Sequence, residues 1–165
     1  MLADIQEAGH ALLLAAGYEH YEVSAYARPG QQCRHNRNYW QYGDYLGIGC
    51  GAHGKLTSAN GDILRILKVR SPKAYLDQQR PRTEALNPVA AAERPFEFML
   101  NRLRLFSPFA LAEFSALTGV DAAAIAAPLA RAVAQGLLQQ QGGNVQLTAQ
   151  GRRYLNSVLT LFLPE

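Results

Sequence analysis

Residues 33–54, CRHNRNYWQYGDYLGIGCGAHG, gather the residue types that could do chemistry in this chain. They include both cysteines, two of the four histidines and the only tryptophan. An imidazole, two amides, a cation and two large rings follow one another from His35 to Trp40. This first half fits neither the strand period of 2 nor the helix period of 3.6, so we expect a loop or a short turn.

The second half of the stretch, residues 44–54, predicts a short apolar strand that runs into glycines. Glycine at the alternate positions 47, 49 and 51 removes the side chains from one face. A flat ligand or another backbone can approach such a face closely, and tight strand packing is the alternative explanation. Residues 49–54 also fit the dinucleotide pattern G-x-G-x-x-G, but that pattern needs a helix directly afterwards. Residues 55–62 predict a hairpin instead, so we interpret the match as coincidental.

The two cysteines and two nearby histidines could supply four zinc ligands, but their spacing is unusual for a zinc site. Cys33 lies two residues before His35, and Cys50 lies three residues before His53. Structural zinc sites pair like ligands as Cys-x2–4-Cys or His-x3–5-His, and nothing in the sequence brings these two pairs together. We therefore expect no metal site, and we expect the cysteines to be small buried apolar residues in a chain from a reducing cytoplasm.

The motif HNRNYW followed by DYLGIGCGAHG closely resembles the HemW-type haem chaperones, which are radical S-adenosylmethionine proteins related to oxygen-independent coproporphyrinogen III oxidases. The likeness continues through residues 17–24 (GYEHYEVS), 95–105 (PFEFMLNRLRL) and 147–152 (LTAQGR). In that family an N-terminal Cys-x3-Cys-x2-Cys motif carries a [4Fe-4S] cluster, and this chain has only Cys33 and Cys50. The resemblance therefore implies the C-terminal portion of such a protein, with the cluster and S-adenosylmethionine belonging to a missing N-terminal part.

The resemblance also implies where ligands would bind. A neutral imidazole can ligate haem iron, aromatic rings can stack on a macrocycle, and arginines can meet its propionates. The candidate haem-binding residues are His35, Asn36, Tyr39 and Trp40, with Arg28, Arg34 and Arg37 nearby. The alternative for His35 is a loop histidine bonded to backbone, with Trp40 as a packing anchor. The candidates for a cofactor or substrate pocket are Gly47, Ile48, Gly49 and Gly51.

The elements that position these residues divide into two predicted domains, residues 1–82 and 83–165. The first predicts a helix over 2–16, a strand over 20–26, a hairpin over 55–66 turning at Asn60-Gly61, a helix over 73–79 and a linker over 80–83. A helix and strand with no earlier strand suggest an α/β unit that continues upstream. The resemblance implies the last elements of an incomplete parallel (β/α) barrel, in which residues 44–51 form the final strand, with a small hairpin extension.

The second domain predicts a mostly helical, winged-helix-like layout. Helices are expected over 87–94, 96–106, 109–117 and 122–135, then a hairpin over 137–148 and a last helix over 149–162. DNA binding by such a layout would place the second helix of the pair in the groove. That helix carries a single base, Arg131, and eight alanines, whereas phosphate contacts need several Lys or Arg. We therefore interpret the module as a packing or lid domain.

The distribution of charged and apolar residues limits the kinds of partner that we expect this chain to bind. Residues 28–82 carry ten Lys or Arg against three Asp, so a positive field surrounds the central stretch and attracts anions, unless it is only a solvated basic face. No apolar run approaches the ~18 residues of a membrane helix, and the N-terminus lacks a basic signal-peptide region. An open parallel strand edge would favour a homodimer.

Together these features predict a fragment of a radical S-adenosylmethionine haem chaperone that binds haem and delivers it to haem proteins. Two cysteines cannot ligate the cluster, so we expect no radical catalysis from this chain alone. A fragment of an oxygen-independent coproporphyrinogen III oxidase is the first alternative, and a winged-helix nucleic-acid-binding module is the second. The HNxxYW motif favours the chaperone, because in the family it separates that branch from the oxidases.

Overall fold

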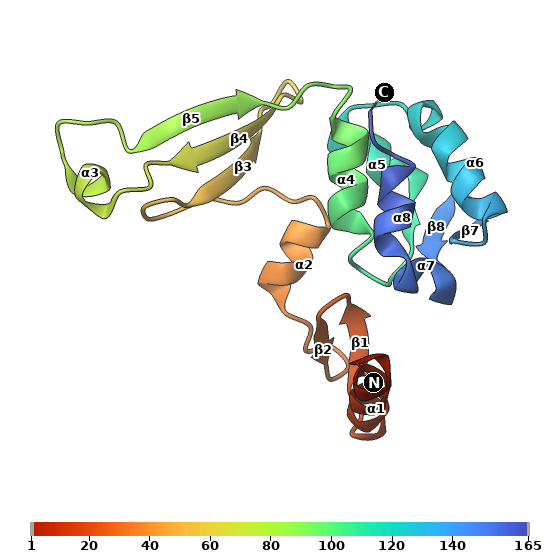
Figure 1. Ribbon diagram of the computed structural model, residues 1–165. Helices are drawn as coiled ribbons and strands as arrows, with labels where there is room; N and C mark the ends of the chain where they lie inside the picture. Colours follow the sequence, from red (N-terminus) through yellow and green to blue (C-terminus); the bar gives the residue numbers. More distant parts are fainter. Residues whose placement is uncertain (1, 165) are drawn as a thin grey trace.

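The structure is a computed structural model that describes residues 2–164 of the chain, with side chains from Asp4 onward. Three parts are visible in Figure 1: an N-terminal helix with a small hairpin, a three-stranded arm, and a helical body that contains the C-terminal end of the described chain. Helix α2 (Arg34–Trp40) lies between the hairpin and the arm. The candidate residues on α2 therefore lie between the N-terminal hairpin and the arm, whereas the candidate glycines lie along the arm.

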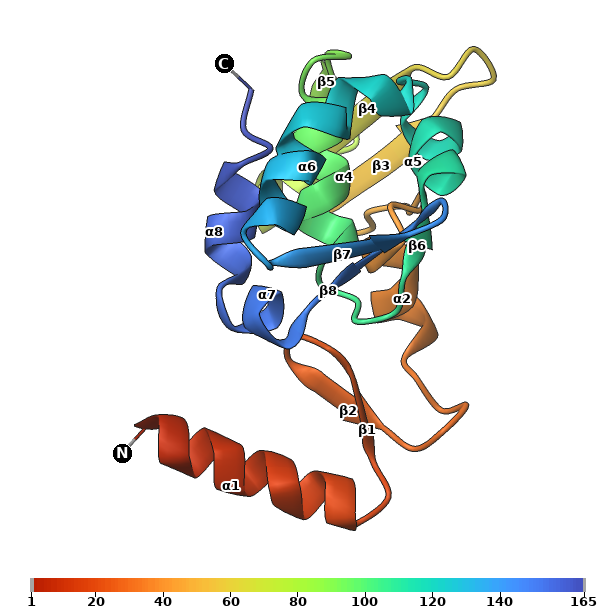
Figure 2. The ribbon, with the colours of Figure 1, turned by 90° about the vertical axis from the view of Figure 1, so that its right-hand side faces the viewer.

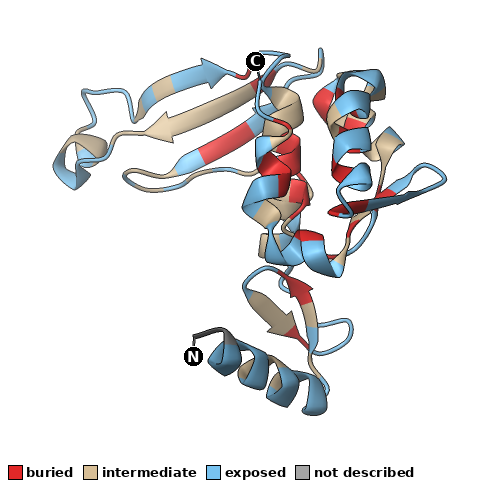
Figure 3. Ribbon diagram, turned by 45° about the vertical axis from the view of Figure 1, so that its right-hand side comes forward, coloured by how far each residue is buried: buried red, intermediate tan, exposed pale blue. Residues whose placement is uncertain are grey.

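The N-terminal part consists of α1 (Leu2–Ala15) and the strands β1 (Glu19–Glu22) and β2 (Ala25–Ala27). The predicted helix is confirmed, and Gly17 follows it with φ of +80°. Its apolar residues face outward: Ile5 and Leu12 are 65% and 73% exposed, and the helix projects from the rest of the chain (Figure 2) and is coloured as exposed in Figure 3.

The single strand predicted over residues 20–26 is wrong, because the chain reverses at Val23-Ser24 and β1 pairs antiparallel with β2. The reversal has a physical cause in the body of the molecule. The Val23 amide donates to the Arg104 carbonyl at 3.1 Å, and Glu22 forms a bridge with Leu105. The outer partner of β1 is thus a distant segment that the local pattern could not indicate.

The arm is an antiparallel sheet in the order β3 (His53–Thr57), β4 (Ile63–Lys68), β5 (Thr83–Pro88). The predicted hairpin is confirmed, but its turn is wider than a two-residue type I′ turn. The Ser58 amide donates to the Asp62 carbonyl at 2.8 Å, and only Gly61 of the Asn-Gly pair has positive φ. The helix predicted over 73–79 is the shorter α3 (Pro72–Leu76), which is capped by Ser71, whose hydroxyl accepts from the Ala74 amide.

Strand β5 replaces two sequence predictions, the end of a linker over 80–83 and the start of a helix at residue 87. It pairs with β4 from Lys68↔Thr83 to Leu64↔Pro88. A pairing partner 15 to 24 residues away outweighs the local Asn-Pro signal for a helix start. Helix α4 (Arg94–Arg102) begins only afterwards, with Pro95 in its first turn.

The body packs α4, α5 (Leu111–Thr118), α6 (Ala126–Ala134) and α8 (Leu155–Thr160) around one apolar core. Phe98 is fully buried and meets the rings of Phe109 and Phe114 with centroids 5.4 and 5.3 Å apart. The remaining elements are the 3-10 turn η1 (Ala122–Ile125), the sheet of β6 (Phe109–Ala110), β8 (Asn144–Leu147) and β7 (Leu138–Gln141), and the short helix α7 (Ala149–Arg153).

Helix, turn, helix, hairpin and helix follow one another in the body in the predicted order. Asp121 caps η1 by accepting from the Ala123 amide, and Gly119 and Gly136 end α5 and α6 in left-handed conformations. The last predicted helix is broken at Tyr154 into α7 and α8, and Tyr154 is exposed rather than inward.

The mixed α/β character with small sheets is confirmed, whereas the strand expected over residues 44–51 is wrong. That segment is irregular, and only Tyr45 forms a bridge, which is antiparallel and joins it to Lys55. Every strand pair between residues 2 and 164 is antiparallel. In the same described part, no single helix is long and apolar enough to cross a membrane; α5 and the η1–α6 segment meet the length and composition criteria only together, as a pair bent by 113°.

Candidate functional site

The motif HNRNYW forms helix α2, so the predicted loop is wrong. The Arg37 amide donates to the Cys33 carbonyl at 3.0 Å, and the Gln41 amide donates to the Arg37 carbonyl at 2.8 Å. None of its side chains is fully buried. A helix without a buried stripe shows no apolar period, which is why the sequence pattern missed it.

His35 lies on an exposed face of α2 and begins a row of aromatic rings. Its imidazole meets the Tyr39 ring edge-on at 4.6 Å, and Tyr39 meets the Tyr45 ring at 4.2 Å. The Tyr45 hydroxyl accepts a hydrogen bond from Arg65 of β4 at 3.2 Å. The row therefore connects the candidate haem residues to the start of residues 44–54, which we call the glycine segment. Asn36, also on α2, is half-buried.

The Trp40 ring lies 6.4 Å from the Tyr39 ring and packs against the N-terminal hairpin. It contacts the small cluster of Tyr21, Ala27 and Leu105, and the Arg104 guanidinium lies 4.3 Å from its ring centroid. Arg104 also lies 3.7 Å from the buried carboxylate of Glu22. The structure thus brings His35 and Tyr39 together and places Trp40 in a packing position.

Three buried polar atoms of this packing region have no hydrogen-bond partner among the described residues. They are Trp40 Nε1, Glu22 Oε2 and Arg104 Nε. Buried polar groups are almost always paired, with water or a ligand where the protein offers no partner. This region of α2 and β1 is therefore incompletely satisfied.

The glycine segment serves two structural purposes. A Cβ atom at Gly47 would run into the backbone of His53, so Gly47 allows the close approach of the segment to β3. Gly49 and Gly51 have φ of +103° and +69°, and the Gly49 amide donates to the Tyr75 hydroxyl at 3.1 Å. Ile48, between Gly47 and Gly49, is 86% exposed. Close packing thus explains Gly47, while Ile48 remains open to a ligand or a further segment.

A buried polar network that the sequence did not indicate lies behind the glycine segment. Lys55 of β3 is only 2% exposed, and its Nζ donates to the Tyr42 carbonyl and to Asp44 Oδ1, each at 2.9 Å. The Tyr42 hydroxyl donates to Glu97 Oε2 at 3.1 Å, and Arg65 donates to the same oxygen at 2.7 Å. The network joins the glycine segment, the arm and α4.

Two pKa shifts follow from this arrangement. Burial raises the pKa of the Tyr42 phenol well above its usual range, and the neighbouring Glu97 carboxylate adds to the effect. Burial by itself would raise the pKa of Asp44, but hydrogen bonds from Lys55 and Thr57 outweigh it and lower that pKa on balance. Tyr42 is therefore a neutral donor and Asp44 an ionised acceptor at neutral pH.

The cysteines are not the buried residues that we expected. Cys33 and Cys50 are both free and exposed. Among residues 2–164, no three His, Cys, Asp or Glu side chains are grouped so as to hold a metal ion.

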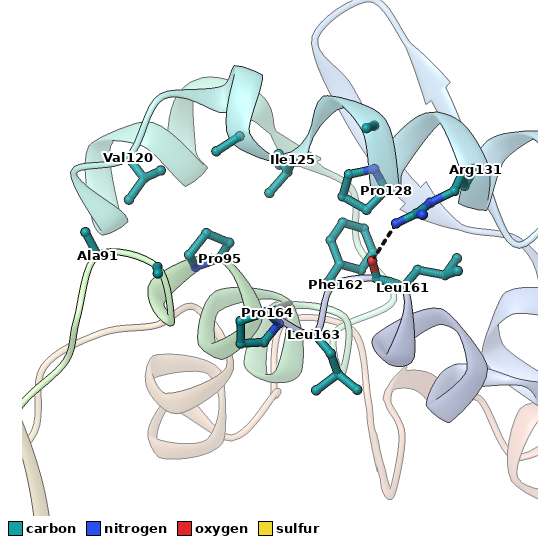
Figure 4. Close-up of a pocket in the computed structure, with 13 residues that line it drawn as sticks. Ala91, Pro95, Val120, Ile125, Pro128, Arg131, Leu161, Phe162, Leu163 and Pro164 are labelled. Carbon is teal, nitrogen blue, oxygen red and sulfur yellow. Dashed lines mark hydrogen bonds between the residues drawn. The ribbon is translucent and has the colours of Figure 1, made fainter.

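The body contains an apolar cavity of about 460 Å³ between α4, the η1–α6 segment and the chain after α8 (Figure 4). Pro95, Ile125, Pro128 and Phe162 are among the residues that line it. Its one charged side chain, Arg131, donates to the Leu161 carbonyl at 3.3 Å. The lining of this cavity contains no Asp, Glu, His, Cys, Lys or Tyr side chain that could act as an acid, a base or a nucleophile. A second, polar cleft of about 470 Å³ borders α2 itself.

Comparison with known proteins agrees with the resemblance seen in the sequence. Residues 89–154 match the family described as HemN C-terminal domain. Over 164 residues the chain is 50% identical to the protein named heme chaperone HemW of Escherichia coli, and 46% identical to the protein of that name from Haemophilus influenzae. These alignments cover 99% of this chain, which spans only 43% and 42% of the two relatives.

Comparison of the fold also finds a similar solved structure. The chain is similar to a solved structure described as coproporphyrinogen III oxidase (HemN) from Escherichia coli, a radical SAM enzyme. The TM-score is 0.67 over 97% of this chain and 40% of that chain, with 17% identity. At that identity the likeness concerns the fold alone. The predicted relationship to the HemW group is confirmed by the sequence matches.

Proposed function

Because this chain is related along its whole length to proteins named heme chaperone HemW, we propose that it is the C-terminal part of such a chaperone and takes part in binding haem and delivering it to haem proteins. The observation that carries the proposal is the 50% identity to the Escherichia coli relative across 99% of the chain. The likeness to the oxidase HemN, at 17% identity, extends to the fold only and does not favour the oxidase alternative.

Haem is the cargo in this proposal, and His35 is its candidate iron ligand. The imidazole is exposed, makes no hydrogen bond among the described residues, and lies against Tyr39. An unprotonated nitrogen of such a ring is free to ligate iron. Tyr39 offers a ring for stacking at the same face, and Asn36 offers an amide on the same helix. Trp40 would support the site by fixing α2 against Arg104.

The cluster and the cofactor chemistry belong, in this proposal, to the N-terminal part of the longer protein. A [4Fe-4S] cluster of this family needs three cysteines, and Cys33 and Cys50 are two exposed thiols on separate segments. Gly47, Ile48, Gly49 and Gly51 would then border the S-adenosylmethionine or substrate pocket from this side. Leu46 and Ile48 of this segment are 73% and 86% exposed, so the segment presents apolar side chains that such a pocket could cover.

The finer architecture is also part of the proposal. We move the boundary between the two domains from residues 82/83, where the sequence placed it, to near residue 88, because β5 pairs with β4 and ends at Pro88, and the HemN C-terminal domain match begins at residue 89. Residues 1–88 would then hold the end of the partial barrel with its arm, and residues 89–164 the winged-helix-like domain. The homodimer and the cytoplasmic location remain predictions, and the free cysteines agree with a reducing compartment.

Nucleic-acid binding by the winged-helix-like domain is not favoured. The only base of α6, Arg131, is engaged with the Leu161 carbonyl. Phosphate binding needs several unengaged Lys or Arg side chains on one face.

A haemin titration followed by absorbance tests the proposal. The chain is expected to give a saturable Soret shift, and His35→Ala is expected to bind roughly tenfold or more weakly. His53→Ala is the matched control, because His53 is also an exposed histidine but lies on β3. Equal binding by His35→Ala would assign the iron to another residue. No saturable shift in the unmodified chain would mean that this part of the protein does not hold haem.

A further inference from the structure

The polar cleft beside α2 is formed by segments that are far apart in the sequence. Its lining includes His20 of β1, Gln32 and Arg37 at α2, Phe106, and Arg152 of α7. Figures 1 and 2 show the β1–β2 hairpin next to both α2 and α7. Arg37 and His35 are two residues apart on one helix, so their side chains leave it about 200° apart. His35 is not among the residues that line the cleft.

Two guanidinium groups border the cleft without a carboxylate partner. Arg152 is held in place by the Phe106 ring, whose centroid lies 4.4 Å from its guanidinium carbon. Within residues 2–164 neither Arg37 nor Arg152 forms an ion pair. Glu19 is the one acid in the lining. Two cations against one anion leave a positive charge that a ligand could neutralise.

The cleft also holds an imidazole and a side-chain amide. Burial lowers the pKa of His20, repulsion by Arg152 lowers it further, and the hydrogen bond to the Val23 carbonyl and the charge of Glu22 oppose the shift only in part. The Nε2 of His20 lies 3.4 Å from the Val23 carbonyl. Gln32 can donate from its amide. A planar guanidinium presents paired donors that match the two oxygens of a carboxylate.

From this geometry we propose that the cleft is a carboxylate-binding site, in which Arg37 and Arg152 hold the acid group of a ligand between α2 and α7. If the proposed haem function holds, the propionate arms of a tetrapyrrole are the expected source of that group. A small free carboxylic acid has the same chemistry. The volume of about 470 Å³ lies within the range of small-molecule sites, ~300–1,000 Å³.

The site is tested first without any porphyrin, so that the result does not depend on haem binding. Succinate is titrated into the chain, and the guanidinium resonances of Arg37 and Arg152 and the pH titration of His20 are followed by NMR. We expect saturable shifts of both guanidinium groups and a raised His20 pKa, because a bound anion stabilises the imidazolium. Arg152→Gln and Arg37→Gln should each weaken succinate binding roughly tenfold. Absence of a saturable shift at both arginines overturns the proposal.

Matched control variants distinguish binding in the cleft from a general effect of positive charge. Arg153→Gln is adjacent on α7, but Arg153 is largely exposed and only 3.5 Å from Glu7. Arg34→Gln is on α2 and does not line the cleft. Both controls should bind succinate like the unmodified chain. If they weaken binding as much as the cleft variants do, the effect is a general field and the site is wrong. Unchanged thermal unfolding of each variant shows that the fold is intact.

The source of the carboxylate is tested with haemin and its dimethyl ester, whose propionates are blocked. If the arms enter this cleft, the chain should prefer haemin over the ester by about tenfold, and Arg152→Gln should lose the preference. A preference that survives in Arg152→Gln, together with succinate binding, keeps the carboxylate site and assigns it to a small acid. Loss of haemin binding in His35→Ala alone would leave the haem function standing even where the cleft fails.

Discussion

Lys55 is the residue whose replacement best tests the polar network behind the glycine segment. Its Nζ donates to the Tyr42 carbonyl and Asp44 Oδ1, each at 2.9 Å, and to Thr57 Oγ1 at 3.3 Å, and it lies 4.2 Å from the Tyr42 ring centroid. Lys55→Met keeps the length of the apolar stem and removes the charge and its donors. Little cavity is created, so the loss comes from the polar contacts.

The size of the stability loss in Lys55→Met depends on which hydrogen bonds the partners of Lys55 keep. The buried Tyr42 carbonyl loses the Lys55 donor, which costs about 1–3 kcal/mol. Asp44 keeps its hydrogen bonds from Thr57 and has a side chain that is 39% exposed, so water replaces the ammonium and this part of the loss is ~1 kcal/mol or less. We expect the free energy of unfolding to fall by about 2–3 kcal/mol in Lys55→Met.

Urea unfolding at pH 7, followed by circular dichroism, measures this change. Lys73→Met in α3 is the control, because Lys73 is exposed and makes no hydrogen bond or ion pair within the described residues. It should change the free energy of unfolding by less than about 0.5 kcal/mol. A loss in Lys55→Met as small as that of the control would refute the assignment of Lys55 as a buried, fully engaged cation.

Two further predictions concern the same region. Gly47→Ala should destabilise the chain by about 1–3 kcal/mol because its Cβ would meet the His53 backbone, whereas Gly9→Ala, where a Cβ meets no heavy atom within 4 Å, should stabilise α1 by about 0.5–1 kcal/mol. Thermal unfolding of both variants checks the opposite signs. The lowered pKa of Asp44 means that its contribution to stability is present above the pKa of the unfolded carboxyl and is lost as pH falls through the folded value. Asp44→Asn should therefore lose less stability on acidification from about pH 5 to pH 2, and urea unfolding at several pH values that showed equal losses would contradict this.

Local signals predicted the parts of the fold that local chemistry decides. Asn60-Gly61 predicted the β3–β4 hairpin, and helical segments predicted near residues 73 and 122 follow the capping residues Ser71 and Asp121. In each case the residue type supplies the conformation or hydrogen bond that the element needs.

The elements that the sequence missed depend on partners far along the chain. Strand β5 exists because β4 lies beside it, and β1 ends at Glu22 because Leu105 and Arg104 take up its next hydrogen bonds. Helix α2 has no fully buried face and so no apolar period. None of these causes is visible in a local window of sequence.

Some residues of the candidate site could likewise be predicted from the sequence, and others could be found only from the structure. His35, Tyr39 and the glycines were indicated by residue type, and the structure brings the first two together beside the glycine segment. The buried Lys55 could not be predicted, because lysine is normally exposed and its partner Asp44 lies across a loop. Arg37 and Arg152 lie 115 positions apart in the sequence and line the same cleft. Their proximity could not be predicted without the structure.

Comparison of haemin with iron-free protoporphyrin tests whether His35 holds the iron of haem. The affinity of each macrocycle is measured for the unmodified chain and for His35→Ala by fluorescence quenching of the protein. If His35 ligates the iron, the unmodified chain should prefer haemin by roughly tenfold or more, and His35→Ala should bind both macrocycles equally. An unchanged preference for haemin in His35→Ala, or no preference in the unmodified chain, would contradict the assignment of His35 as the haem ligand.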